Sequence, residues 1–166
     1  IKNIHIQALC VDASCTGNPG QMEYRAVDLH TRKEVFHSPI YSMGTNNLGE
    51  FLAIYDAIRH IEKKNKTKTP SKYECIFSDS ETAIERVKSK KIKTTLPYND
   101  QTKELLTKVQ EAATRLKTHN FDIPIRKRET EIDEKSQQIL IGNNRFHPKL
   151  ICHPEQSEGY NKPLIF

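Results

Sequence analysis

Tryptophan is absent from this chain of 166 residues, and cysteine occurs only four times. No two cysteines have the spacing of a zinc or redox motif, and no two of the seven histidines stand at i, i+4. The sequence also lacks an apolar run long enough to span a membrane and a signal-peptide pattern. These absences argue against Cys-based metal and redox sites and favour a reduced, cytoplasmic protein with no membrane partner.

The length and charge set further limits. A chain of this size is long enough for one domain with a sizeable core. The net charge of +5 is compatible with a polyanionic partner, although solubility alone also explains a modest positive charge. The chain begins at Ile1 rather than at methionine, so we expect a preceding segment.

The hydrophobic pattern predicts alternating strands and helices. Three strands with short links, followed by two more that are separated by helices, are expected at residues 4–11, 22–28, 34–41, 73–78 and 121–127. Helical spacing predicts one helix after the polar residues 44–47, a short one capped by Ser80, and one from Asn99 or Asp100 to about residue 117. After Arg128 the pattern is lost, and residues 146–166 are expected to be irregular.

Three carboxylates stand at the joints of this pattern. Asp12 and Asp79 each follow a predicted strand, and Glu50 is expected in the first turn of the helix between them. If the two strands are parallel neighbours, their carboxyl ends bring these groups together, and such a cluster favours Mg²⁺ or Mn²⁺. The alternatives are a solvated Asp12 before a reverse turn and a Glu50 that only complements the helix dipole.

A basic run follows the short helix, with lysines at residues 88, 90, 91 and 93 and then Thr94 and Thr95. It is interpreted either as a solvated face or as a surface that holds a polyanion. Together with the carboxylates, the second interpretation predicts metal-dependent phosphoryl chemistry on a nucleic acid.

Three motifs in this order resemble bacterial ribonuclease H. They are Asp12 with the Gly-Asn-Pro-Gly of residues 17–20, the Gly-Thr-Asn-Asn-Leu-Gly-Glu of residues 44–50, and the Ser-Asp-Ser of residues 78–80. The similarity is collinear over residues 4–128 and is greatest to the subfamily that often carries an N-terminal hybrid-binding domain. It implies an α/β fold with a five-stranded mixed sheet flanked by helices, and a monomeric endonuclease that cleaves the RNA strand of RNA–DNA hybrids.

The resemblance also implies roles for individual residues. Asp12, Glu50 and Asp79 match catalytic metal ligands for two Mg²⁺ ions, which Mn²⁺ can replace. Thr45 and Thr95 match a pocket for a phosphate of the DNA strand, and Glu81 stands where relatives often have Gln. The full set of expected nucleic-acid-binding residues is Ser14, Gly17, Asn18, Thr45, Asn46, Asn47, Ser80, Glu81, Lys91, Lys93, Thr94 and Thr95.

The chain departs from the family pattern near its end. The fourth ligand, an Asp in a Gly-Glu-Ile-Pro-Ala-Asp stretch, is missing after Thr130, and Arg86 and Arg128 stand where relatives usually have Trp. Read out of frame from the codon of Asp133, the possible codons encode most of the missing stretch. We therefore interpret residues 1–130 as a ribonuclease H-like domain and residues 131–166 as an aberrant segment after a frameshift. Asp133 or Glu134 is the candidate substitute ligand, and the alternative function is a non-catalytic hybrid-binding protein or a decayed gene product.

Overall fold

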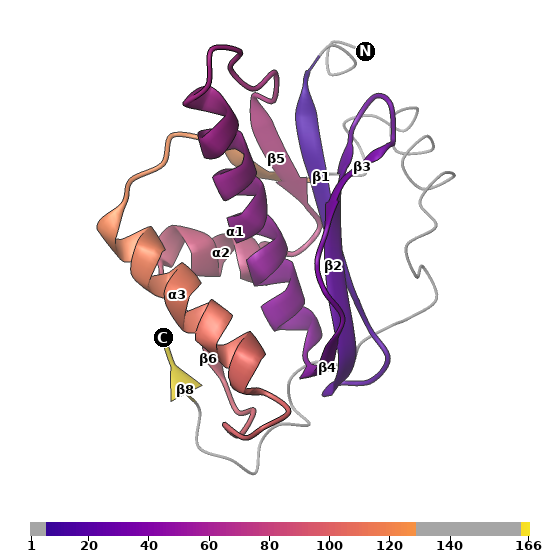
Figure 1. Cartoon of the computed structure of the whole chain (residues 1–166), viewed down its shortest axis with the longest axis vertical. Helices are drawn as coiled ribbons and strands as arrows, with labels where there is room; N and C mark the ends of the chain where they lie inside the picture. The colour runs from indigo at the N-terminus through magenta and orange to yellow at the C-terminus, as the bar shows by residue number, and fades with distance from the viewer. Residues whose placement is uncertain (1–5, 129–163) are drawn as a thin grey trace.

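The computed structural model of the chain describes residues 6–128 and 164–166 (Figure 1). Its main sheet has the strand order β3–β2–β1–β5–β7, and β4 pairs with β2 beside this path. The strands are β1 (Ala8–Cys15), β2 (Gly20–Asp28), β3 (Glu34–His37), β4 (Tyr41–Gly44), β5 (Cys75–Ser78) and β7 (Ile125–Lys127). β2 runs antiparallel to β1, β3 and β4, whereas β5 runs parallel to both β1 and β7. The predicted mixed sheet flanked by helices is confirmed, with six strands in the described residues where five were expected.

Three helices supply the rest of the domain: α1 (Asn46–Asn65), α2 (Glu81–Ser89) and α3 (Lys103–Thr118). α1 lies across the sheet, and α3 lies beside α1 (Figure 1). One apolar cluster joins the sheet to all three helices, and the predicted stripe of α3 belongs to it, with Leu105, Val109, Ala112, Ala113 and Leu116 all buried. The core therefore fixes α1 against β1 and β2.

Two strand predictions need correction because of proline. Residues 34–41 do not form one strand but divide into β3 and β4, with Pro39 between them. Proline has no N–H and cannot continue the ladder, while the Ser38 N–H still bonds to Tyr24 O at 2.8 Å. Likewise β7 begins after Pro124 instead of at residue 121, although Pro124 O accepts a bond from Ile76 N.

The boundaries of three other elements also differ from the predictions. β1 extends past residue 11 to Cys15, because β2 pairs with it as far as the Cys15–Met22 register. β5 begins at Cys75 rather than at residue 73. α3 begins at Lys103, since Asn99 first forms a turn in which its Oδ1 accepts bonds from Gln101 N and Thr102 N.

A small second sheet joins distant parts of the chain. Strand β6 (Lys93–Thr94) pairs antiparallel with β8 (Leu164–Ile165). Phe166 extends this pairing through bonds to and from Ile92. The prediction that residues 146–166 are irregular is therefore wrong for Leu164 and Ile165. For residues 129–163 the prediction of an aberrant segment lies outside the described residues.

Candidate active site

The register of the sheet brings Asp12 and Asp79 to the same place. The last parallel pair between β1 and β5 is Cys10 with Phe77, and each aspartate lies two residues further along its own strand direction. Neighbouring strands are about 5 Å apart, so Asp12 and Asp79 follow the last β1–β5 pair on adjacent chains. Asp12 is not at the end of β1, as predicted, but at the point where β5 no longer accompanies β1.

Glu50 reaches this place from α1. The side chain of Thr45 caps the helix by accepting a bond from Leu48 N, so α1 begins at Asn46 and Glu50 lies in the second turn. The predicted first-turn position is therefore wrong, and a role limited to the helix dipole loses its basis. Ala13 lies in the part of β1 that extends past its pairing with β5, and its N–H donates to Glu50 Oε1 at 3.0 Å.

Gly49 allows this close approach of α1 to the sheet. A Cβ atom at residue 49 would lie 2.9 Å from Ala13 Cβ and 2.9 Å from Met22 Sδ. Any larger residue would push the helix away from β1 and β2, because no real Cβ sits so close to other heavy atoms. The small residue before Glu50 is thus part of what places its carboxylate against β1.

The Glu50 carboxylate is buried without full compensation. Burial raises its pKa well above the usual value, and the negative charges of Asp12 and Asp79 raise it further. The bond from Ala13 N acts in the opposite direction, but Glu50 Oε2 is buried and accepts no hydrogen bond. A hard divalent cation would neutralise this repulsion and use the orphaned oxygen, so the donor chemistry fits Mg²⁺ or Mn²⁺.

Asp79 differs from Glu50 because it already has a cationic partner. Its side chain is 53% exposed, and Oδ2 accepts a bond from Arg128 Nη2 at 2.7 Å. The next acidic residue, Glu81, pairs with Lys127 at 3.2 Å. Within residues 6–128 and 164–166, no three His, Cys, Asp or Glu side chains are gathered so that they could hold a metal ion. The three predicted carboxylates share one region, but they do not form a finished ligand set.

Sequence reasoning did not anticipate these basic partners. Arg128 and Lys127 lie at the end of β7, the parallel neighbour of β5, so the topology places them beside Asp79 and Glu81. Arg25 is likewise the cross-strand partner of Asp12. The only available signal was the basic stretch that closes the fifth predicted strand.

The predicted hybrid-contacting residues from two motifs lie together. Asn18, in the turn between β1 and β2, accepts a bond through Oδ1 from the backbone N–H of Asn46 at 3.1 Å. This bond connects the turn to the start of α1, close to Gly17 and Asn47 in the chain. Ser14 and Thr45 are buried, and Ser80 caps α2 by accepting a bond from Ala83 N.

The basic run surrounds the end of α2 and strand β6. Lys90 ends α2 in the left-handed conformation, with φ at 62°, and Lys88, Lys91 and Lys93 are exposed. Thr94 is buried, and its hydroxyl accepts a bond from Leu96 N. Thr95 is half-buried next to it.

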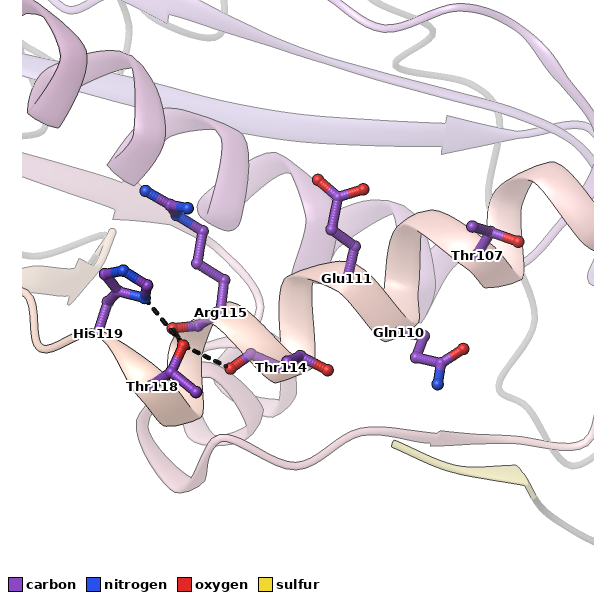
Figure 2. A pocket seen from close by; sticks show the side chains of 7 residues that line it. All are labelled: Thr107, Gln110, Glu111, Thr114, Arg115, Thr118 and His119. Atoms are coloured by element: carbon purple, nitrogen blue, oxygen red, sulfur yellow. Dashed lines mark hydrogen bonds between the residues drawn. The ribbon is translucent and has the colours of Figure 1, made fainter.

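A separate hollow of about 430 Å³ lies along α3 (Figure 2). It is lined by polar residues of that helix, including Glu111 and Arg115, and by His119, whose Nδ1 lies 2.8 Å from Thr118 Oγ1. None of the predicted site residues lines this hollow, so it is distinct from the carboxylate region. Among the described residues, no helix combines the length and apolar character needed to cross a bilayer.

Several solved structures and one family model are similar to this chain. A search of solved structures finds RNase H1 from the halophilic archaeon Halobacterium salinarum, at 17% identity and a TM-score of 0.46, covering 83% of this chain and 98% of that one. It also finds LC11-RNase H1 in complex with an RNA/DNA hybrid, at 16% identity and a TM-score of 0.45, covering 75% of this chain and 86% of that one. The N-terminal RNase H domain of a Mycobacterium tuberculosis protein matches at 19% identity and a TM-score of 0.42, over 72% and 84%.

Those identities are too low to carry an activity from one protein to another. The family assignment depends instead on the match of residues 6–125, well over half of the chain, to the family model described as RNase H. This range contains the whole main sheet except the last two residues of β7, and it contains all three carboxylates. The chain belongs to the RNase H family.

Proposed function

We propose that this protein cleaves the RNA strand of RNA–DNA hybrids with two Mg²⁺ ions, which Mn²⁺ can replace, held by Asp12, Glu50 and Asp79. The observation that carries the proposal is the orphaned Oε2 of a buried Glu50 beside two further carboxylates. Members of the family generally use divalent metal ions. The ions, when bound, supply Lewis acidity at the scissile phosphate.

The protein's own residues position the hybrid. Asn18, Asn46 and Asn47, with Gly17 and Ser14, frame the approach to the carboxylates from the β1–β2 turn and the start of α1. Amide and backbone groups of this kind can sense the 2′-hydroxyl that distinguishes RNA from DNA. The hybrid complex of LC11-RNase H1 supports a hybrid as the partner class.

A second surface holds the backbone of the hybrid. Lys91 and Lys93 are exposed beside β6, and we propose that they contact phosphates together with the half-buried Thr95. For Thr45, at the start of α1, and Thr94, whose side chains are buried, we propose phosphate contacts through the main chain. The positive charge supplies affinity that does not depend on sequence. Ser80 and Glu81, which open α2 next to Asp79, complete the proposed contacts, and Asp133 or Glu134 is the proposed fourth ligand.

A labelled RNA–DNA hybrid with Mg²⁺ or Mn²⁺ tests the proposal. We expect cleavage of the RNA strand by the unaltered chain and at least about a hundredfold slower cleavage by Asp12→Asn. Asp122→Asn is the matched control, because Asp122 is exposed in the segment before β7 and lies apart from the proposed ligands in the chain. Equal rates in Asp12→Asn and the control would contradict the proposed role of Asp12.

The alternative is a hybrid-binding protein without turnover. The Asp79–Arg128 ion pair favours it, because one proposed ligand is already neutralised and the described residues contain no complete ligand set. A gel shift of the hybrid without cleavage in either metal supports this alternative. Cleavage that is lost in Asp12→Asn excludes it.

A further inference from the structure

We propose that Arg128 is a positioning residue that competes with a divalent ion for Asp79 and thereby raises the divalent-ion concentration that the site would require. This inference rests on the proposed function, because it concerns the same carboxylates. Arg128 and a divalent ion would compete for the same carboxylate, that of Asp79. The residue that touches the proposed ligand directly is thus a regulator of metal affinity and not itself a ligand.

The backbone of β7 places Arg128 at Asp79. Ser78 and Lys127 form the last pair of β5 and β7. Asp79 directly follows β5, and Arg128 directly follows β7. Arg128 N also donates to Ser78 O at 3.0 Å, so the main chain of Arg128 is tied to the residue before Asp79. The contact therefore follows from the sheet register, which places the two residues next to each other.

The ion pair is anchored on the arginine side. The Arg128 side chain is 24% exposed, whereas that of Asp79 is 53% exposed, and Nη2 donates to Oδ2 at 2.7 Å. The guanidinium carries one fixed charge and five donors, so it binds a carboxylate well but cannot accept electron density from several oxygens as a metal does. Asp79 is the more exposed partner, and its carboxylate is the group that would exchange Arg128 for a divalent ion.

Arg128 does not replace the metal. Glu50 Oε2, the oxygen that most needs a cation, has no hydrogen-bond partner although Arg128 is paired with Asp79. The arginine thus neutralises the exposed carboxylate and leaves the buried one uncompensated. A divalent ion that engages Asp12 and Glu50 must still compete with Arg128 for Asp79, which makes the effect a tuning of affinity and not a block.

The neighbouring residue offers a matched control. Lys127, the last residue of β7, directly precedes Arg128 in the chain, carries the same charge and pairs with Glu81 at 3.2 Å. Glu81 is not a proposed metal ligand. Removal of either charge changes the general electrostatic field by one unit, but only Arg128→Gln releases Asp79.

Mn²⁺ binding to the full chain, measured by electron paramagnetic resonance and by calorimetry, tests the proposal without any catalytic readout. We expect Arg128→Gln to bind Mn²⁺ about three- to fivefold more tightly than the unaltered chain, the range set by a partly exposed ion pair. Lys127→Gln should change the affinity less than about 1.5-fold. Arg128→Lys, which keeps the charge but loses the planar fork, should fall between the unaltered chain and Arg128→Gln.

A double-mutant cycle locates the effect at Asp79. In an Asp79→Asn background, Arg128→Gln should no longer tighten Mn²⁺ binding, because the competed ligand is gone. An equal gain in that background, or equal gains in Arg128→Gln and Lys127→Gln, would overturn the proposal and leave only a general charge effect. Circular dichroism of each variant confirms that the fold is retained, and Arg128→Lys provides the folded comparison if Arg128→Gln is unstable.

Mn²⁺ binding together with hybrid cleavage distinguishes a failure of this inference from a failure of the proposed function. Tighter Mn²⁺ binding by Arg128→Gln without hybrid cleavage in any variant would uphold the inference and contradict the nuclease proposal. Cleavage that depends on Asp12, with unchanged Mn²⁺ affinity in Arg128→Gln, would uphold the nuclease and contradict the inference. The absence of Mn²⁺ binding in every variant would overturn both.

Discussion

Two carboxylates are buried among the residues that the structure describes, and their surroundings are opposite in kind. Asp28, at the end of β2, is 3% exposed and Glu50, in α1, is 6% exposed. Asp28 Oδ1 accepts bonds from His30 N at 2.8 Å and Thr31 N at 2.9 Å, and Oδ2 accepts a bond from Tyr73 Oη at 2.8 Å. Lys72 adds a salt bridge at 3.1 Å, so every oxygen of Asp28 is satisfied.

The same physical terms move the two pKa values in opposite directions. Burial alone would raise the pKa of Asp28, but its hydrogen bonds outweigh burial and lower it below the usual range. For Glu50, burial raises the pKa, and Asp12 and Asp79 raise it further, against a single bond from Ala13 N. Asp28 is a finished structural group that ties the β2–β3 turn to the segment before β5.

The comparison shows what an unfinished polar group signifies. Asp28 shows that this fold can supply hydrogen bonds to both oxygens of a buried carboxylate. Glu50 lacks a partner for Oε2, and it is also the buried carboxylate with two further acidic side chains nearby. Groups that are left uncompensated at such a cluster are typical of sites where a ligand completes the charge balance. Asp28 thus serves as the internal reference for Glu50.

The largest expected difference is in activity. We expect Glu50→Gln to reduce hybrid cleavage by at least about a hundredfold, because the amide keeps the bond from Ala13 N but loses the charge that a metal needs. Asp28→Asn should change cleavage less than about twofold for each folded molecule. Single-turnover cleavage at matched folded concentrations measures both, and similar losses in the two variants would remove the distinction between the carboxylates.

Stability should change in the reverse order. Asp28→Asn is expected to lower the free energy of unfolding by about 1–3 kcal/mol, since the new amide turns a donor toward Lys72 and Tyr73. Glu50→Gln should raise it by about 1 kcal/mol in metal-free buffer, because the cost of burying this charge and its repulsion with Asp12 and Asp79 are both removed. Urea denaturation at pH 7 with EDTA measures both values. A destabilised Glu50→Gln would show that the charge of Glu50 is compensated after all.

The pH dependence follows from the direction of each shift. Because the folded pKa of Glu50 is raised, the folded state binds this proton more tightly, and stability from this group declines as pH rises above about 4.5 through the folded value. The folded pKa of Asp28 is lowered, so its contribution is present above about 3.8 and is lost as pH falls through the folded value. Urea denaturation between pH 2 and 8 in EDTA should show the first decline flattened in Glu50→Gln and the second reduced in Asp28→Asn. An unchanged profile in either variant would contradict the corresponding assignment.

The fold was largely predictable because local patterns and packing agree in most elements. The stripe of Leu105, Val109 and Leu116 is helical in spacing and is buried as expected, and Ser80 caps the helix that it was expected to cap. The break at Pro39 was readable from chemistry, since proline cannot extend a ladder, but the pattern of apolar residues on both sides concealed it.

The sequence predicted which carboxylates lie in the candidate site, but not their exact positions or their basic partners. Parallel strands bring Asp12 and Asp79 together whatever the precise strand ends, so the convergence did not depend on the wrong boundary of β1. The length of β1 is set by its pairing with β2, and the contact of Arg128 with Asp79 is set by the register of β7 on β5. The β1–β2 pairing and the β5–β7 register each depend on residues far apart in the sequence, so no local pattern predicts them.

The smallest expected effect concerns the basic surface and extends the comparison to the charges around each carboxylate. Lys93→Ala should reduce the slope of log affinity against log salt for the hybrid by about one, because one phosphate contact is lost. Lys33→Ala, in the exposed turn after Asp28, removes the same charge and should leave the slope unchanged. Filter binding from 50 to 300 mM salt in EDTA measures both slopes without cleavage. Equal slopes in the two variants would show that the hybrid contacts Lys93 no more than it contacts Lys33. The lysines around β6 would then form a solvated face.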